Sequence, residues 1–342
     1  METAVAVCFT SYNLLDFTGP DDRTASLRQA LAEAQPDVLA VQEIVDGTAA
    51  GAGRLLHQLA DSLGLLCTVD ARGTTAIASG QHRYHVGLLW RPGITSLPGT
   101  WSASQAGDFH HALARLQLDV GAREPVTFAS YHADPFRPAR RFDEAHRVVA
   151  ALTRPPGPAV IGGDFNSVSA DRTAQGDYYD HDPYADQEWY ADLLYQVEWN
   201  AHPDAPHRAD RSPAEVLRRG GLLDAAATLD CPWQPTTGHW PVGDPFGPRR
   251  IDMIRTTRHL LPALAGYRVL RTHAALNGSD HLPVSIDLEP AMISSRSVDR
   301  TPRSRHPAPV RNYGETVNAA GPHARITGPL IHTGRTGDTR LP

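Results

Sequence analysis

The sequence contains no lysine, only three cysteines and no long apolar run, and the last two features each exclude a class of protein. Every permanently cationic side chain among the 342 residues is an arginine. Cys8, Cys67 and Cys231 lie far apart, so they are not the paired framework of a disulfide-rich secreted domain, and we expect free thiols in the cytoplasm. An apolar run of the roughly 18 residues that a membrane span needs is missing, and the first residues lack a signal-peptide pattern. We therefore expect a cytoplasmic protein with no membrane span and no obligate protein partner.

Charge is distributed unevenly along the chain. The net charge is −6, and residues 291–342 carry eight arginines against three acidic residues, which leaves −11 on residues 1–290. Residues 1–290 therefore lack the broad excess of positive charge that is typical of nucleic-acid-binding proteins, although a local groove can still be basic. Residues 291–342 are rich in Pro, Gly, Ser, Thr and Arg with few large apolar residues. We expect a catalytic domain at 1–290 and a disordered tail at 291–342.

Predicted strands are short, and only a few helices interrupt them. Alternating polarity and short apolar runs predict strands over 4–13, 38–41, 65–69, 86–90, 113–120, 126–131, 160–161, 250–255 and 284–288. Apolar residues at helical spacing predict helices over 24–34, 54–63 and 142–152. Residues 113–120 and 126–131 are expected to form a hairpin. This mixture favours an α+β sandwich, in which two sheets pack face to face with helices on their outer faces.

A long segment, residues 171–248, separates two of these strands. Seven aromatic residues between 178 and 199 indicate an ordered segment rather than a disordered one. They would either pack as the core of an extra subdomain or stack on the bases of a substrate. Acidic residues at 177, 180, 182, 186 and 188 would repel a polyanion. Ser212 to Glu215 forms a capping-box pattern, which predicts a short helix that ends at residues 220–221.

The most informative motif is VIGGDFN at residues 160–166. An apolar strand stops at two glycines, which let another backbone or a ligand come close. Asp164 and Asn166 follow two residues apart, and at the end of a strand that spacing aims both side chains toward one face. A carboxylate and an amide held side by side suit a phosphate and the water that attacks it. Taken alone, the same residues are explained equally well by a polar turn.

Five other segments place polar residues where a predicted strand stops or begins. They are SYN at 11–13, QE at 42–43, SYH at 130–132, RID at 250–252 and SDH at 279–281. One such residue is structural more often than catalytic. Together, the six motifs would gather one set of side chains around a single rim of the sandwich: Asn13, Glu43, His132, Asp164, Asn166, Asp252, Asp280 and His281.

The acidic members of this set suit metal-assisted chemistry. Glu43 and Asp280 offer hard oxygen ligands, which favour Mg²⁺ or Mn²⁺ over zinc, and no cysteine lies near these motifs. A bound ion would neutralise a phosphate oxygen and stabilise the leaving oxygen. Asp164 is the candidate to orient and deprotonate water.

The remaining members of the set can stabilise the negative charge that develops on a phosphate during hydrolysis. Asn13, Asn166 and His132 can donate hydrogen bonds to phosphate oxygens. Asp252 is the candidate partner that fixes the tautomer of His281 and favours its cationic form.

These motifs, in this order, resemble the endonuclease/exonuclease/phosphatase superfamily, the DNase I-like phosphoesterases. The resemblance spans residues 5–288 and implies a four-layered α/β sandwich with two mostly antiparallel sheets, and a divalent-metal-dependent phosphoester hydrolase. It implies that Glu43 binds metal, with Asn13 beside it and Asp280 in support of the metal or the histidine. It also implies that Asp164 positions the water and that Asp252 pairs with His281. The phosphate-binding set would be Asn13, His132, Arg141, Asn166 and His281.

Two positions qualify the resemblance. Some members carry a metal-binding Asp two residues after the first Asn, where this chain has Leu15. Arg141 matches the arginine that many members place after the histidine motif, but Arg137 and Arg140 stand beside it, and a solvated helix start would explain the group equally well. The segment 171–248 follows the Asp164 turn directly, so we expect an insertion that borders the active site.

Several functions remain open from the sequence. The first hypothesis is a phosphoester hydrolase, either a nuclease or an enzyme for a small phosphorylated metabolite or lipid; the acidic body favours the compact substrate. A binding module that lost its chemistry is a second hypothesis, which the intact polar set disfavours. A non-hydrolytic biosynthetic enzyme on the same fold is a third.

Overall fold

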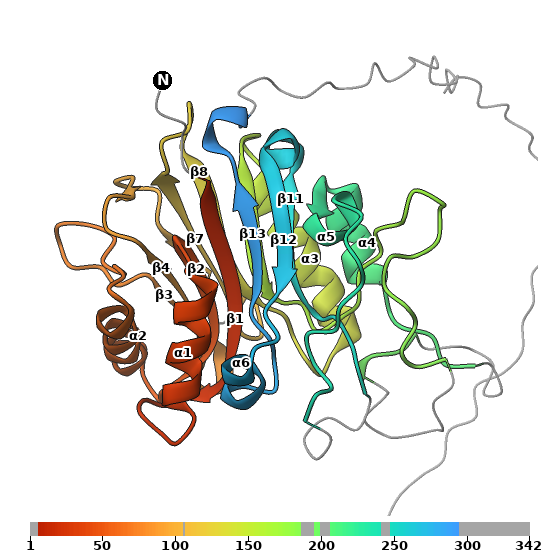
Figure 1. Cartoon of the computed structure of the whole chain (residues 1–342), viewed down its shortest axis with the longest axis horizontal. Helices are drawn as coiled ribbons and strands as arrows, with labels where there is room; N and C mark the ends of the chain where they lie inside the picture. The colour runs from red at the N-terminus through yellow and green to blue at the C-terminus, as the bar shows by residue number, and fades with distance from the viewer. Residues whose placement is uncertain (1–5, 105–106, 186–194, 199–205, 241–246, 294–342) are drawn as a thin grey trace, which may run out of the picture. The chain divides into compact units, whose positions relative to one another are not determined.

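The computed structural model describes residues 6–104, 107–185, 195–198, 206–240 and 247–293 (Figure 1). The predicted disordered tail lies outside these ranges from residue 294 onward, and the division into a domain, an insertion and a tail stays a prediction. In this described part, no helix has both the length and the apolar character that crossing a bilayer requires.

Six strands of the described chain form the first sheet, in the order β12-β13-β1-β2-β4-β3. The strands are β1 (Val7–Phe17), β2 (Val38–Val45), β3 (Ile77–Ser79), β4 (Tyr84–Trp90), β12 (Leu264–Val269) and β13 (Val284–Leu288). β1 and β2 run parallel, and the other neighbours run antiparallel.

The second sheet has the order β10-β11-β9-β8-β7-β5, with β6 also paired to β7. Its strands are β5 (Thr95–Ser96), β6 (Ser102–Ala103), β7 (Ala112–Asp119), β8 (Val126–His132), β9 (Ala159–Asp164), β10 (Leu222–Asp224) and β11 (Asp252–Thr257). Only the β8–β9 pair is parallel among the pairings described for this sheet. The predicted hairpin forms as β7 and β8, and the prediction of two mostly antiparallel sheets is confirmed.

Helices cover the outer faces of both sheets (Figure 1). They are α1 (Thr24–Ala34), α2 (Ala49–Leu63), α3 (Pro138–Thr153), α4 (Ser212–Arg219), α5 (Ala225–Thr228) and α6 (His273–Gly278), with 3₁₀ turns η1 (Gln81–Arg83), η3 (Arg258–Ala263) and η4 (Pro290–Met292). α1 and α2 bury Leu27, Leu31 and Leu56 in the larger core with the first sheet. α3 buries Val148 and Leu152 against the second sheet. The four-layered sandwich is therefore confirmed.

Close contact between the sheets depends on glycine at the predicted motif. Phe9 on β1 and Phe128 on β8 meet edge to face across the sandwich, with ring centroids 5.3 Å apart. A Cβ on Gly162 would lie 2.7 Å from Cβ of Ser11 in the facing sheet, and a Cβ on Gly163 would lie 2.0 Å from the carbonyl oxygen of Tyr131 in the neighbouring strand. The prediction that these glycines let another backbone or a ligand come close is confirmed at Gly163, which meets the Tyr131 backbone, whereas Gly162 makes room for the Ser11 side chain.

Two local predictions are wrong. Residues 65–69 form no strand and make only isolated bridges at Leu66 and Thr68. In α4, Ser212 is not the N-cap: Arg211 holds that position without a side-chain cap. The hydroxyl of Ser212 instead donates to Oδ1 of Asp210, 2.6 Å away. A competing local acceptor therefore takes the group that a capping box requires.

Candidate active site

The polar motifs on β1 and β2 lie at irregularities inside the strands, not at their ends as predicted. The β1–β2 pairing shifts register after Asn13, and the β2–β4 pairing shifts between Val41 and Ile44. Glu43 has a φ of 61°, a left-handed conformation that is uncommon for a residue with a side chain. A bulge re-aims a side chain, so local backbone strain accompanies the placement of the Glu43 carboxylate.

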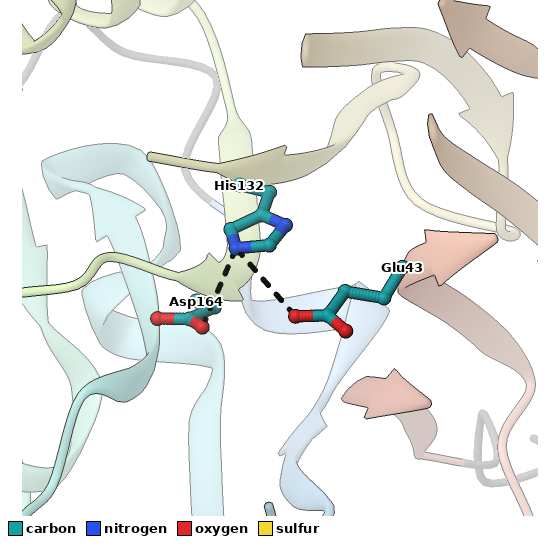
Figure 2. Close-up of side chains that lie close together, drawn as sticks. All are labelled: Glu43, His132 and Asp164. Atoms are coloured by element: carbon teal, nitrogen blue, oxygen red, sulfur yellow. Dashed lines mark ion pairs between the residues drawn. The ribbon is translucent and has the colours of Figure 1, made fainter. Parts of the chain in front are cut away.

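Asn13 joins two carboxylates that come from different sheets. Its Nδ2 donates to Oε1 of Glu43 at 3.0 Å and to Oδ2 of Asp164 at 3.2 Å. Figure 2 shows His132 facing the same two carboxylates. Nε2 of His132 lies 3.5 Å from Oδ2 of Asp164 and 4.0 Å from Oε1 of Glu43. Four residues that are distant in sequence therefore converge on one point.

His281 approaches Asp164 from the loop that precedes β13. Its Nε2 lies 3.8 Å from Oδ2 of Asp164, while its Nδ1 lies 2.8 Å from Oδ2 of Asp252. Asp252 begins β11 and sits opposite Asp164 in the antiparallel β9–β11 pair. The backbone N–H of Asp252 donates to Oγ1 of Thr236, which fixes the start of the strand. Since Nδ1 donates to Asp252, Nε2 is the nitrogen that faces the cluster.

Asn166 reaches its place by a turn, not by strand alternation as predicted. β9 ends at Asp164, and Asn166 adopts a left-handed φ of 47°. Its backbone N–H donates to Oδ1 of Asp164 at 2.9 Å, and its Nδ2 donates to the carbonyl of Ala133 at 3.2 Å. The turn thus braces Asp164 from one side.

Two predicted residues lie at or beyond the edge of the cluster. Oδ1 of Asp280 is 3.9 Å from Nε2 of His281, and 26 % of the Asp280 side chain is exposed. The guanidinium of Arg141 is buried, and it donates to the carbonyls of Asp134 at 2.9 Å and Tyr195 at 2.6 Å. These contacts favour a structural role for Arg141, and its phosphate-binding role stays a prediction.

Burial dominates the electrostatics of the cluster. It raises the pKa of Glu43, and it raises the pKa of Asp164 to about 7, with His281 opposing both shifts. Burial also holds the pKa of His132 well below its usual value, so this imidazole is neutral. The pKa of His281 is raised well above its usual value, because Asp252, followed by Asp164 and Asp280, outweighs the effect of burial. The site therefore places a cationic histidine beside two carboxylates, Glu43 and Asp164. Its positive charge does not cancel the effect of burial, which disfavours their ionised forms.

This donor set fits a divalent cation. Among the described residues, the ligand atoms of Glu43, His132 and Asp164 all lie within 4.8 Å of one another, as do those of Asp164, Asp252 and His281. Asp280 belongs to neither group, so its predicted metal role stays a prediction. Oxygen-rich sets without sulfur suit hard divalent ions, and a cation would offset the cost of burying the Glu43 and Asp164 charges.

His111 is a neighbour of the site that the sequence did not reveal. Its ring stacks on that of His132, with centroids 3.9 Å apart and planes 19° apart. Nδ1 of both imidazoles is buried with no hydrogen-bond partner in the described protein. The His-His pair at 110–111 was the available signal, but the β7–β8 register is needed to place it: Ala112 pairs with His132.

A hydrogen-bonded link between the sheets lies beside the cluster. Nε2 of Gln42 donates to Oγ of Ser130 at 3.0 Å, and that hydroxyl donates to the carbonyl of Val41 at 2.9 Å. The link ties β2 to β8 one residue before Glu43 and two residues before His132. It holds the two halves of the site in register.

A buried ionic network fixes the start of the segment 171–248. Arg250 donates to Asp180 at 2.7 Å and to Asp224 at 2.6 Å, and all three side chains are almost completely buried. The predicted repulsion of a polyanion by Asp180 is therefore wrong, because its charge is paired inside the protein; residues 186 and 188 lie outside the described ranges. Tyr179 and Tyr184 are also buried, which favours core packing for these two aromatics.

Sequence and structure comparisons agree on the family. A model of the Endonuclease/Exonuclease/phosphatase family matches residues 10–281. The chain belongs to the endonuclease/exonuclease/phosphatase family. Members of this family are phosphoesterases, and the resemblance drawn from the six motifs is confirmed. No curated protein matches the chain by sequence.

Solved structures of this family share its fold at low identity. An endonuclease/exonuclease/phosphatase from Bacteroides vulgatus has a TM-score of 0.56 at 15 % identity, over 83 % of this chain and 98 % of that one. A 3′-5′ exonuclease from Neisseria meningitidis has a TM-score of 0.52 at 16 % identity, over 83 % and 100 %. A humanized TDP2 from D. rerio has a TM-score of 0.51 at 14 % identity, over 82 % and 98 %.

Proposed function

We propose that this chain hydrolyses phosphate esters with the help of a divalent metal ion, Mg²⁺ or Mn²⁺. The observation that carries the proposal is the convergence of Asn13, His132 and His281 on Oδ2 of Asp164, beside the carboxylate of Glu43. Three nitrogens that can donate to an anion and a carboxylate that can accept a proton thus share one small volume. This combination suits phosphoester hydrolysis, in which a base accepts a proton from water and donors stabilise the charge on the phosphate.

Asp164 is the residue that would activate water. Its raised pKa, about 7, makes its carboxylate a better proton acceptor than an ordinary aspartate near neutral pH. A water that donates to Asp164 would attack phosphorus and transfer a proton to the carboxylate as the bond to the leaving oxygen breaks. The N–H of Asn166 on Oδ1 keeps the carboxylate oriented.

The donors around Asp164 would stabilise the charge that develops on the phosphate. The neutral His132 and the amide of Asn13 donate without a charge of their own, whereas His281 carries a positive charge maintained by Asp252. Preorganised donors of this kind contribute most when they are buried. Glu43 would hold the metal ion, which would neutralise a phosphate oxygen and stabilise the leaving oxygen when bound.

The substrate class is the open part of the proposal. One structural relative is described as a 3′ phosphatase bound to a product DNA hairpin, and another as a 3′-5′ exonuclease, which supports substrates that contain nucleotides. The charge of −11 on residues 1–290 supports a compact substrate over a long polyanion.

A substrate panel tests the proposal. Plasmid DNA, RNA, nucleotides, inositol phosphates, and sugar or prenyl phosphates would be assayed with Mg²⁺, Mn²⁺ and EDTA. We expect hydrolysis of at least one class with metal and none with EDTA. A folded protein that is inactive on every class would overturn the proposal and favour a binding role.

A further inference from the structure

An exposed aromatic platform extends outward from the histidine side of the site. Its centre is Phe136, 54 % exposed, whose ring meets those of His110 and Tyr195 edge to face, each with centroids 5.8 Å apart. Tyr195 is itself 40 % exposed. We call these three residues the aromatic platform; His110 is buried, so Phe136 and Tyr195 form its open surface. Two nearly perpendicular neighbours fix the Phe136 ring, yet much of it faces solvent.

The platform is continuous with the catalytic cluster. His110 contacts His111 with ring centroids 4.6 Å apart, and His111 stacks on His132 at 3.9 Å. Phe136 follows His132 by four residues, a stretch that spans at most ~14 Å of extended chain. A ligand that joins a phosphate at His132 to the Phe136 ring would therefore have to span no more than this distance.

Buried polar groups hold all three segments of the platform in place. Oδ1 of the fully buried Asp134 accepts the backbone N–H of Phe136 at 2.8 Å. Arg141 joins the carbonyls of Asp134 and Tyr195, two segments far apart in the chain. Glu144 accepts the backbone N–H groups of His110 at 2.6 Å and Asp134 at 3.0 Å. The exposed rings of Phe136 and Tyr195 thus rest on a rigid base, which lowers the entropic cost of binding a ligand to them.

A cation lies at the side of the platform. The Arg137 side chain is 52 % exposed, and its Nε donates to Oδ2 of Asp134 at 2.8 Å. Its Nη2 lies 2.8 Å from Nδ1 of His110. An ordered guanidinium next to an open ring can hold an anionic group on the same ligand that stacks on the ring.

The aromatics of the described part of 171–184 are less suited to this role. Tyr179 and Tyr184 are buried. Tyr178 is 43 % exposed, but the guanidinium groups of Arg172 and Arg211 already lie over its ring, at 3.9 and 4.2 Å from the centroid. The platform offers a more accessible ring.

We propose that Phe136 is a specificity-determining residue, on which a nucleobase of the substrate stacks while the adjacent phosphodiester is hydrolysed. This inference rests on the proposed phosphoesterase function and narrows its substrate class to phosphodiesters that carry a nucleoside. Every base has a flat face, so stacking selects nucleosides without selecting among sequences. The edge contacts with His110 and Tyr195 hold the ring ready for such stacking.

Two esters with the same leaving group test this inference. Thymidine 5′-(4-nitrophenyl phosphate) carries a base, and methyl 4-nitrophenyl phosphate does not, so the ratio of their kcat/KM values isolates the nucleoside. Phe136→Ala should lower kcat/KM for the thymidine ester about tenfold and leave the methyl ester unchanged, in line with one stacked base. Phe136→Trp should keep the wild-type ratio. Phe142→Ala removes another exposed ring, one that packs on His146, and should change neither substrate.

The outcomes distinguish a failure of the proposed stacking role of Phe136 from a failure of the proposed phosphoesterase function. If the wild type hydrolyses both esters and Phe136→Ala keeps its ratio, the inference is wrong while the phosphoesterase function stands. If the wild type hydrolyses neither diester, the proposed function still stands where the substrate panel shows metal-dependent hydrolysis of another class, and it fails where the panel shows none. Binding then decides the inference: calorimetry with Mg²⁺ should show tighter binding of thymidine 5′-monophosphate than of methyl phosphate, and Phe136→Ala should abolish the difference. Equal binding of the two by the wild type would overturn it.

Discussion

Nδ1 of His281 lies 2.8 Å from Oδ2 of Asp252, inside the protein and on the far side of the imidazole from Asp164. The pair sets both the tautomer and the charge of His281. Asp252 opens β11 directly opposite Asp164, so the same strand pairing that builds the sheet also aligns the two acids on the histidine.

Asp252→Asn should move the basic limb of the pH–rate profile to lower pH. Asp252 raises the pKa of His281, so its neutral replacement lowers that pKa. If cationic His281 is the active form, the rate falls as pH rises through its pKa, and that fall begins at lower pH in the variant. A profile of kcat/KM between about pH 5 and 10 measures it. Asp287→Asn, which loses a surface pair with Arg268, should show no shift; an unmoved limb in Asp252→Asn would contradict the assignment.

Mg²⁺ should raise the melting temperature of the wild type and have a much weaker effect on Glu43→Gln. A ligand that binds only the folded state adds about 2.7 kcal/mol at a concentration of 100 Kd. Without metal, Glu43→Gln should melt no lower than the wild type: burial raises the pKa of Glu43, so its ionised form opposes folding at pH 7.

Thermal melts in EDTA and in a Mg²⁺ series give both results from one experiment. Glu33→Gln, on the exposed face of α1, is the matched control and should follow the wild type. The same Mg²⁺ shift in Glu43→Gln and the wild type would remove Glu43 from the metal site.

Arg250→Met should be strongly destabilising. The change leaves Asp180 and Asp224 as buried acids without their shared guanidinium, and the loss of one partner in a buried ion pair costs about 3–5 kcal/mol. Urea unfolding measures the change in free energy. Arg219→Met, where 76 % of the arginine side chain is exposed, should cost at most about 1 kcal/mol. Similar stabilities for the two variants would mean that the network does not hold the fold.

Gly162→Ala should destabilise the sandwich by about 1–3 kcal/mol. The added Cβ would lie 2.7 Å from Cβ of Ser11, so the facing sheet would have to move. Gly157→Ala adds the same atom where nothing lies within 4 Å, and it should leave stability unchanged or slightly higher. Equal effects in urea unfolding would show that the sheets tolerate a wider gap at this point.

Local patterns were enough for much of the fold. The helix at 24–34 and the strand at 284–288 form at the predicted residues, because their apolar periodicity is regular and their ends carry clear stop signals. The predicted strands at 4–13 and 38–41 continue to Phe17 and Val45. Their extra length depends on register shifts at Asn13 and Glu43, which arise from pairing with neighbouring strands and leave no mark in the local sequence.

The candidate site, like the fold, could be predicted from the sequence only where it does not depend on long-range contacts. Motif order was sufficient to bring Asn13, Glu43, His132 and Asp164 together, because each motif sits on a strand that the fold places at one rim. It was not sufficient to separate the neighbouring arginines of α3, since the contacts of Arg141 include a carbonyl 54 residues away. Contacts of that range depend on how the segment 171–248 folds back onto α3.

The release of 4-nitrophenolate by the wild type and by Asp164→Asn tests the central claim most directly. 4-Nitrophenyl phosphate and methyl 4-nitrophenyl phosphate, each with Mg²⁺ or with EDTA, cover monoester and diester. We predict metal-dependent hydrolysis of at least one ester by the wild type, and a rate lower by roughly 10²–10⁴-fold in a folded Asp164→Asn variant. Hydrolysis at the wild-type rate by that variant, or none of either ester by folded wild type with Mg²⁺ or Mn²⁺, would contradict the account.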